Sequence, residues 1–377
     1  MKRKFAAVLS MIVAAVLVMS PIAHASQLLL DVETFAGIGS HGSDDGEMAQ
    51  FNMPLGIIEV EGRIMVADTF NSMLRAVDPN GSVESLSRIF PLRDEIGFPF
   101  GGHIDRVKIE ALFNHPTDFA RGRNDWIFVA DSQNNAIRVI VEGSVYTMAG
   151  GFGEGFADGD RQAVRFNRPF AVAVSPRGLI YVADTGNHVI RQIDLEGNVT
   201  TVAGVPGVYG YQNGAQEEAM FDSPMGLVFD QAGRLLVADT GNHVIRILYE
   251  GQVSTFAGTR QVLPGDGQGY WLDDPIGGFL DGDVELARFN RPMGMAVSGD
   301  TVFVADSGNH ALRVISYHQV FTVSGTGLPG HVDGDLASAM FYMPGGLYIS
   351  GDALFVADSG NNVIRRVSLN AVFDLMP

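Results

Sequence analysis

Short apolar runs separated by turn-forming residues dominate this chain. Runs of four to six apolar residues are bounded by Pro, Gly, Asn and Asp, which is typical of short β-strands. The 3.6-residue spacing that a helical solenoid needs does not accompany them. The pattern predicts a unit of four strands, called a, b, c and d in chain order, which in one unit are Gly226–Phe229, Leu235–Ala238, Val244–Leu248 and Gln252–Ala257.

A ten-residue motif, V-A-D-[TS]-x-N-x-x-[IL]-R, joins strand b to strand c and occurs six times. Its Asp residues are separated by 63, 53, 55, 67 and 52 residues. A four-stranded unit repeated at this scale indicates a propeller, whereas a parallel β-helix has a much shorter period. We therefore predict an all-β fold, a six-bladed β-propeller of four-stranded antiparallel blades, with blades one to six centred on Asp68, Asp131, Asp184, Asp239, Asp306 and Asp358.

Two terminal segments compete for the outer edge of the last blade. Leu30–Gly37 matches strand d but precedes any strand a, and Ala371–Leu375 aligns with the same strand position. Because closure between the two ends of the chain protects an exposed sheet edge, we favour the N-terminal segment as the closing strand.

The first 25 residues have the pattern of a secretory signal peptide. Three basic residues at positions 2–4 precede an apolar run over 5–19 and a small-residue cleavage site at 23–25. A membrane span needs about 20 apolar residues, so cleavage is favoured over an uncleaved N-terminal anchor. We expect residues 1–25 to be removed and 26–377 to form a propeller that is secreted or associated with the cell surface, with no transmembrane anchor.

Charge and cysteine content narrow the range of functions. Without residues 1–25 the chain has 22 Lys and Arg against 43 Asp and Glu, a net charge of −21. This balance argues against nucleic acid as a partner, since Lys and Arg contacts to phosphate supply much of that affinity. The chain has no cysteine, so disulfides and thiol chemistry are excluded.

Residues that recur in all six units are expected to be architectural. The motif Asp can accept backbone N–H groups, the Asn can adopt a left-handed conformation, and the Arg can pair across the turn. His188, His243 and His310 share one turn position, which favours a structural role over metal ligation. Three D-G-D triplets, at 158–160, 281–283 and 333–335, favour the capping of a short helical turn over calcium binding, because the ligand spacing of an EF-hand loop is missing.

These residues resemble a known family. The V-A-D-T-G-N-H-x-I-R core and the upstream F-N-x-P-x-G are similar to the NHL repeat, and six copies cover the chain from about residue 28 to its end. The resemblance implies a six-bladed propeller. It implies function less closely, because NHL-type propellers include extracellular sensor or adhesion modules, RNA-binding modules and relatives that act as lyases or hydrolases with a metal in the central channel.

Candidate site residues are those that depart from the repeat. In an antiparallel blade the d–a and b–c connections lie on one face, and we call the opening of the central channel on that face the mouth. The variable residue of N-x-P is expected there. Blade two departs most, with His115 and Asp118, although Asp118 could equally be an ordinary turn carboxylate. Arg168 and Arg291 occupy the variable position in blades three and five.

Two long d–a loops, at about 86–110 and 259–280, supply further candidates. They fall three blades apart, so we expect them on opposite sides of the mouth, either as ligand-binding loops or as loops that pack on their own aromatic residues. The candidates are Phe100 and His103 in the first loop and Tyr270 and Trp271 in the second.

Two functional hypotheses follow. The first is a non-catalytic binding or scaffold propeller without a cofactor, which recognises an extracellular protein, peptide or carbohydrate at this face. The second is a metal-assisted enzyme of the lactonase or lyase kind, with calcium or zinc in the central channel. The chain lacks both G-x-S-x-G and H-E-x-x-H, which favours the first hypothesis.

Overall fold

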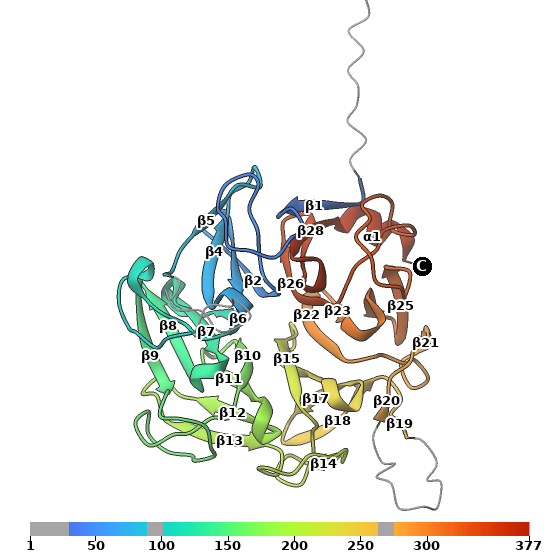
Figure 1. Cartoon of the computed structure of the whole chain (residues 1–377). Coiled ribbons are helices and arrows are strands. Elements are labelled where there is room, and N and C mark those ends of the chain that lie inside the picture. The colour runs from blue at the N-terminus through green and yellow to red at the C-terminus, as the bar shows by residue number, and fades with distance from the viewer. Residues whose placement is uncertain (1–29, 89–100, 263–274, 377) are drawn as a thin grey trace, which may run out of the picture.

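A computed structural model describes residues 30–88, 101–262 and 275–376. Six antiparallel sheets of at least four strands surround a central axis, which confirms the predicted six-bladed propeller (Figure 1). Within each blade strand a is innermost and strand d outermost. Each innermost strand contacts the innermost strands of both neighbouring blades, so the ring is continuous.

The strand boundaries follow the apolar runs of the sequence. Blade one contains β2 (Pro54–Val60), β3 (Arg63–Asp68), β4 (Met73–Val77) and β5 (Val83–Ser85), and blade two contains β6 (Pro116–Arg121), β7 (Ile127–Asp131), β8 (Ala136–Val141) and β9 (Ser144–Gly150). Blade three contains β10 (Pro169–Val174), β11 (Ile180–Asp184), β12 (Val189–Ile193) and β13 (Val199–Ala203), and blade four contains β15 (Pro224–Phe229), β16 (Leu235–Asp239), β17 (Val244–Tyr249) and β18 (Gln252–Ala257). Blade five contains β22 (Pro292–Ser298), β23 (Thr301–Asp306), β24 (Ala311–Ser316) and β25 (Gln319–Ser324), and blade six contains β26 (Pro344–Ser350), β27 (Ala353–Asp358), β28 (Val363–Ser368) and β1 (Val32–Ala36).

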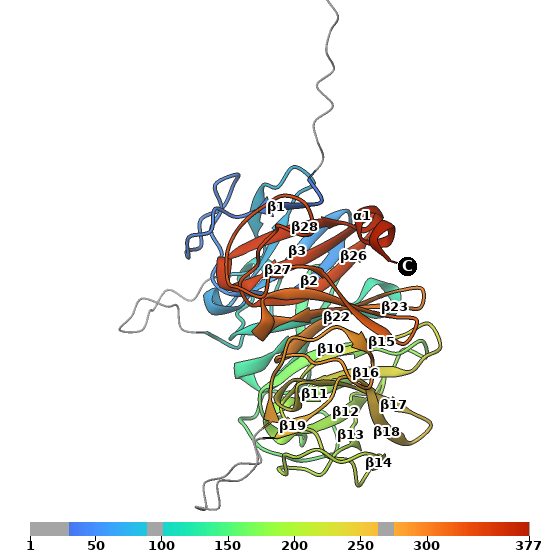
Figure 2. The same ribbon diagram turned by 90° about the vertical axis from the view of Figure 1, so that its right-hand side faces the viewer.

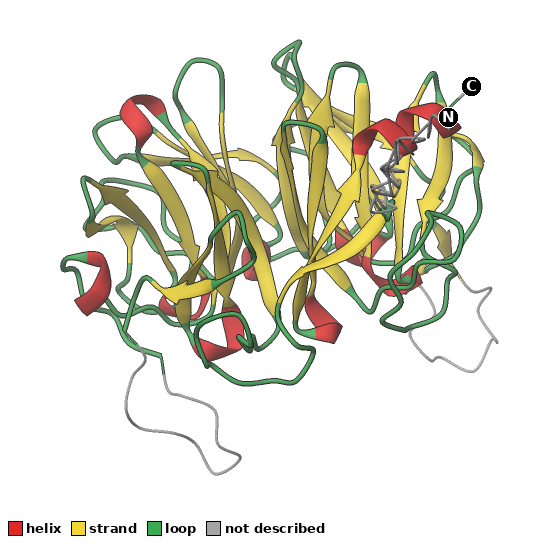
Figure 3. Cartoon of the chain, turned by 90° about the horizontal axis from the view of Figure 1, so that it is seen from above, coloured by secondary structure: helices red, strands yellow, loops and turns green. Residues whose placement is uncertain are grey.

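Smaller elements complete the described part of the chain. β14 (Gly214–Ala215) and β21 (Gly282–Asp283) extend blades four and five on their outer edges, and β19 (Gln261–Val262) pairs with β20 (Pro275–Ile276). Every motif Asp is followed by a 3-10 turn, and these turns are Thr69–Asn71, Ser132–Asn134, Thr185–Asn187, Thr240–Asn242, Ser307–Asn309 and Ser359–Asn361. They gather along one edge of the ring, at the bottom of Figure 3. Two other 3-10 turns are Lys108–Glu110 and Arg123–Asp125, and the α-helix is α1 (Leu369–Leu375).

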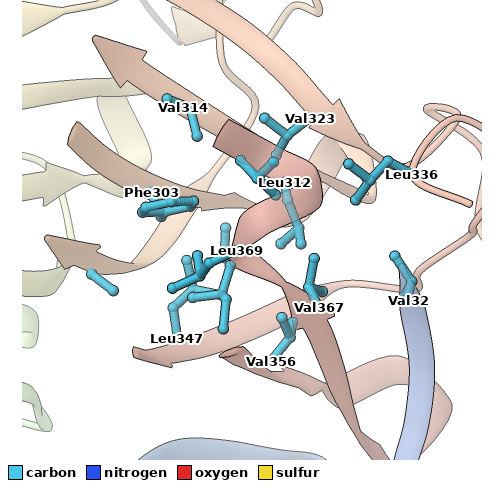
Figure 4. Close-up of a cluster of buried hydrophobic side chains, with 14 of the residues drawn as sticks. Val32, Phe303, Leu312, Val314, Val323, Leu336, Leu347, Val356, Val367 and Leu369 are labelled. Atoms are coloured by element: carbon cyan, nitrogen blue, oxygen red, sulfur yellow. The ribbon is translucent and has the colours of Figure 1, made fainter. Parts of the chain in front are cut away.

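The N-terminal strand closes the ring, as the sequence predicted. β1 pairs antiparallel with β28, with Val32 opposite Val367, and the two strands lie side by side in Figures 1 and 2. Val32 is fully buried and joins Val356 and Val367 in the hydrophobic core of the last blade (Figure 4). Joining the two ends of the chain within one sheet protects the outer edge of β28.

The alternative closure by Ala371–Leu375 is wrong, because these residues form most of α1. Ser368 caps this helix by accepting a hydrogen bond from the Ala371 N–H, and Val372 is fully buried in the core of the last blade. The position beside β28 is already filled by β1, so the C-terminal segment turns away as a helix.

A buried arginine holds each blade together, as blade three illustrates. The Arg191 side chain is inaccessible to solvent and lies between two carboxylates, Nη1 at 2.7 Å from Asp184 and Nη2 at 2.6 Å from Asp158. Its guanidinium carbon is 5.2 Å from the centre of the buried Phe166 ring, and its Nη groups also donate to two backbone carbonyls. The arginine therefore joins the b–c turn, the d–a loop and the aromatic core of one blade.

The same arrangement recurs around the ring, with an inner carboxylate from the motif and an outer group from the d–a loop. The six sets of arginine, inner group and outer group are Arg75, Asp68 and Asp45; Arg138, Asp131 and Asp105; Arg191, Asp184 and Asp158; Arg246, Asp239 and Asn213; Arg313, Asp306 and Asp281; and Arg365, Asp358 and Asp333. Pairing of the motif Arg and Asp across the turn is thus confirmed.

The D-G-D triplets have two separate roles. The second Asp caps a short turn, as expected, since Asp160 accepts from the N–H groups of Gln162 and Ala163 at 2.9 and 3.0 Å. The first Asp, here Asp158, is the outer partner of the buried arginine, a role that the sequence did not reveal. The motif Asn also differs from expectation: Asn187 ends the 3-10 turn and donates to Asp184, and His188, which follows it, adopts the left-handed conformation.

Removal of one inner carboxylate tests the role of the buried arginine. We expect Asp184→Ala to lower the free energy of unfolding by about 3 kcal/mol, because Arg191 keeps its charge in a dry environment with one carboxylate fewer. The exposed pair Arg63–Glu84 provides the control, and Glu84→Ala should cost less than about 1 kcal/mol. Urea unfolding followed by circular dichroism measures both, and equal losses would contradict this role.

Blade four offers the reverse test, since Asn213 stands where the other five blades have Asp. In those blades the outer Asp also accepts the backbone N–H of strand d, as Asp158 does from Thr201 at 3.0 Å, whereas Asn213 Nδ2 faces the Thr255 hydroxyl at 3.4 Å. We expect Asn213→Asp to stabilise the protein by about 1 kcal/mol through a charged partner for Arg246. Thermal unfolding of the wild type, Asn213→Asp and Asn213→Ala checks this, and the Ala variant should be the least stable. An unfolding midpoint of Asn213→Asp below that of the wild type would refute the prediction.

Candidate functional site

The mouth is built by contacts between neighbouring blades. The residue after each 3-10 turn has a left-handed conformation and accepts the backbone N–H of the variable N-x-P residue of the next blade. These contacts run from Ser72 to His115, Asn135 to Arg168, His188 to Ser223, His243 to Arg291, His310 to Met343 and Asn362 to Met53, at 2.8–3.3 Å. The last contact links blade six to blade one.

The three turn histidines therefore have the structural role expected from the repeat. His188, His243 and His310 accept through Nδ1, which places the proton of each neutral ring on Nε2. Burial lowers the pKa of all three rings, so they are held in the neutral form at pH 7.

The variable N-x-P residues are presented by a constrained backbone. All six have φ between 48° and 51°, the left-handed region that non-glycine residues seldom adopt. The contact to the preceding blade holds each in place, which fixes the position of its side chain at the mouth. The six residues are Met53, His115, Arg168, Ser223, Arg291 and Met343.

A pocket of about 380 Å³ opens at the mouth, and we call it the mouth pocket. Phe70 of blade one and Phe170 of blade three line it together with His115, Arg168 and His188. The Phe70 and His115 rings meet edge to face with centroids 5.3 Å apart. The remaining lining residues are Leu55, Thr69, Thr117, Ser132, Gln133, Thr185, Gly186, Ser223 and Met225.

The mouth pocket is electrostatically distinctive in an acidic chain. None of its lining residues is an Asp or Glu. Arg168 is exposed and, within the described ranges, its guanidinium has no hydrogen-bond or ion-pair partner. Burial lowers the pKa of His115, so this ring is also neutral at pH 7. The pocket thus combines one free cation, polar groups and aromatic walls.

Asp118 lies deeper, in the central channel. It lines a small cavity of about 40 Å³, and Thr117 lines both this cavity and the mouth pocket. Four other blades have Gly at this position, where the inner strands converge: a Cβ on Gly226 would lie 2.0 Å from the Met293 carbonyl oxygen. Asp118 is accommodated through a 3.0 Å hydrogen bond from the Val172 N–H.

Asp118 is a carboxyl group with an unusual charge state. It keeps a little accessible surface in the channel, but protein atoms surround it, and this burial raises the pKa of Asp118 to about 7. Among the described residues no Lys, Arg or His forms an ion pair with it. Asp118 therefore holds its proton to a much higher pH than an ordinary aspartate does.

The structure brings some of the candidate residues together and separates others. His115 and Arg168 share the mouth pocket, whereas Arg291 occupies the equivalent position two blades away. His103 instead lies in the d–a loop against the outer strand of blade two, where its Nε2 is 2.8 Å from the hydroxyl of Thr147 in β9. Phe100, Tyr270 and Trp271 lie outside the described residues.

Two aromatic residues of the pocket were missed from the sequence. Phe70 stands where four blades have the Gly of D-[TS]-G-N, and Phe170 follows the Pro of N-x-P. Both positions lie on the expected face, and the sequence signal for Phe70 is its departure from the Gly of the b–c turn.

A larger cavity, about 770 Å³, lies on the opposite face between blades four and five. At the preceding interface the rings of Tyr181 and Phe229 pack edge to face with centroids 5.1 Å apart. Their counterparts here are Leu236 and Val297. These smaller side chains leave the groove open, so the groove is explained by the way blades four and five pack.

Two further observations concern metal and membrane. Over residues 30–88, 101–262 and 275–376, no three or more His, Asp or Glu side chains are grouped closely enough to hold a metal ion. In the same ranges no helix has the length and apolarity to cross a membrane.

Comparison with known proteins agrees with the repeat architecture. The family model "NHL repeat" matches residues 166–193 and 289–315. NHL repeat-containing protein 2 from Bos taurus is 28% identical over 82% of this chain, and Teneurin-3 from Mus musculus is 26% identical over 77%. This chain spans about half the length of the first relative (45%) and 12% of the second.

Solved structures share the fold at low sequence identity. A protein of unknown function from Bacteroides thetaiotaomicron aligns with a TM-score of 0.65 at 17% identity, covering 89% of this chain and 75% of that one. Virginiamycin B lyase from Staphylococcus aureus aligns with a TM-score of 0.52 at 14% identity, covering 84% and 94%. The chain is therefore a six-bladed β-propeller, and NHL repeats are matched in its third and fifth blades.

The raised pKa of Asp118 gives a pH prediction. The folded state holds the Asp118 proton up to about pH 7, whereas the unfolded chain releases it near 3.8, so ionisation favours unfolding between these values. We expect the free energy of unfolding of the wild type, relative to Asp118→Asn, to fall by about 2–4 kcal/mol from pH 4 to 7 and to change little above pH 8. Urea unfolding of the wild type and of Asp118→Asn at several pH values measures this difference. The same pH dependence in both proteins would contradict the raised pKa of Asp118.

Proposed function

We propose that this chain is a non-catalytic binding or scaffold propeller that recognises its ligand at the mouth pocket. One observation carries the proposal: side chains that depart from the repeat, Phe70, His115 and Arg168, converge on a single pocket. The residues that the repeat shares are already engaged in holding blades together. The mouth pocket is therefore a part of the described surface where residues that vary between blades come together.

The size and lining of the pocket suit a small segment of a larger ligand. Binding pockets commonly measure about 300–1,000 Å³ and combine aromatic walls with a few polar groups. The pocket of about 380 Å³ has aromatic walls in Phe70 and Phe170 and polar groups in Arg168 and Thr185. A peptide, a protein loop or a carbohydrate of an extracellular partner fits these dimensions, and the export pattern of residues 1–25 supports a secreted or cell-surface location.

A metal-assisted enzyme is the second candidate function, and Asp118 favours it. A channel carboxyl with a pKa of about 7 can accept or donate a proton near neutral pH. Elemental analysis of the purified protein separates the two candidates. Stoichiometric calcium or zinc that is lost in Asp118→Ala or His115→Ala would favour the enzyme.

Peptide and carbohydrate arrays test the binding proposal. We expect ligands whose affinity falls at least tenfold in Phe70→Ala and Arg168→Ala, since buried aromatic and arginine contacts contribute most at such sites. Arg177→Ala is the matched control, because Arg177 is an exposed arginine of the same blade on the opposite face. Ligands that bind equally to all three variants would place recognition outside the mouth pocket and refute the proposal.

A further inference from the structure

The variable positions around the mouth differ in charge from the hairpins of the opposite face. The hairpins of the opposite face, which join strands a to b and c to d, carry ten acidic residues: Glu61, Asp78, Asp125, Glu142, Asp194, Glu196, Asp230, Glu250, Asp300 and Asp352. The variable N-x-P residues at the mouth include two arginines and no acidic residue. The N-x-P positions that ring the channel opening are therefore free of acidic side chains, although the d–a loops of the same face carry acidic residues such as Asp45, Asp158 and Asp281.

Three arginines of the opposite face are paired with carboxylates, whereas the two at the variable mouth positions are not. On the opposite face Arg63, Arg121 and Arg234 are each paired with a neighbouring Asp at 2.6–2.9 Å. At the mouth, Arg168 and Arg291 have no side-chain partner within the described ranges. Because unpaired arginines in a fixed position bind carboxylates through two parallel N–H groups, they form a recognition site for an anion.

The acidic residue beside the mouth pocket, Asp222, forms no ion pair with Arg168. Asp222 is largely buried and accepts from the Ser223 hydroxyl at 3.0 Å, while its Oδ1 lies 3.5 Å from His188 Nδ1. The motif carboxylates beneath the turns are fully buried and paired with the blade arginines. Arg168 thus faces the pocket with no carboxylate in ion-pair contact among the described residues.

The pocket also provides an apolar surface and a neutral donor beside that charge. Phe70, Phe170, Leu55 and Met225 line it, and an anionic group alone would leave these side chains uncovered. His188 keeps its proton on Nε2, because Nδ1 accepts from Ser223, and can donate to an oxygen of a ligand.

From these observations we propose that the mouth pocket binds an acidic peptide segment, with a carboxylate on Arg168 and an adjacent aromatic or aliphatic side chain against Phe70 and Phe170. This inference rests on the proposed function and names its ligand class. Arg291, across the mouth, adds longer-range attraction for acidic residues that follow in the peptide. Nucleic acid is disfavoured, because phosphate backbones are bound through several cations and the variable mouth positions supply two.

Selection from a displayed library of random peptides on the immobilised chain tests the inference. We expect selected peptides to be enriched in Asp or Glu next to an aromatic or aliphatic residue. A synthetic copy of a selected peptide should lose at least tenfold in affinity when its Asp or Glu is replaced by Asn or Gln. A version with an amidated C-terminus shows whether the carboxylate that binds belongs to a side chain or to the C-terminus. The acid-to-amide difference should disappear in Arg168→Gln and persist in the control Arg177→Gln.

The possible outcomes separate this inference from the proposed function. Peptides that bind through Phe70 but show no preference for acid over amide would overturn the inference and leave the proposed function standing. Peptides whose affinity is unchanged in Phe70→Ala and in Arg168→Gln would overturn the inference and the proposed function together. A single-stranded oligonucleotide that binds more tightly than any selected peptide, and loses affinity in Arg168→Gln, would replace the peptide by nucleic acid.

Discussion

A guanidinium buried between an inner acceptor and an outer one is the interaction on which this propeller depends. Arg191 donates to Asp184 in the b–c turn and to Asp158 in the d–a loop. These two segments are distant in sequence. A buried arginine without partners would be strongly destabilising, so formation of one contact favours the others. Five blades use two carboxylates, and blade four, with Asn213, uses one.

This architecture limits where function can reside. The motif Asp, Asn and Arg of each blade bind one another, and the residue after the turn binds the next blade. Such contacts recur around the ring and are unavailable to a ligand. Ligand binding is therefore left to positions that vary between blades, such as Phe70 and Arg168.

The sequence was sufficient for the fold because its pattern is repeated six times. Strands, blade number and closure by β1 followed from short apolar runs and from edge protection. The outer role of Asp158 could not be predicted, because it depends on a contact between residues 33 positions apart. For the site, spacing correctly identified the face that holds His115 and Arg168, but Phe70 was overlooked, and the depth of Asp118 follows from convergence of the inner strands.

The central claim is that variable residues at the mouth bind the ligand, while repeated residues build the ring. A crystal structure of the chain with an affinity-selected peptide tests it most directly. The account predicts a peptide carboxylate about 2.7–2.9 Å from the Arg168 guanidinium, with an apolar side chain against Phe70 and Phe170. A peptide seated in the groove between blades four and five, or on the acidic hairpins of the opposite face, would contradict it.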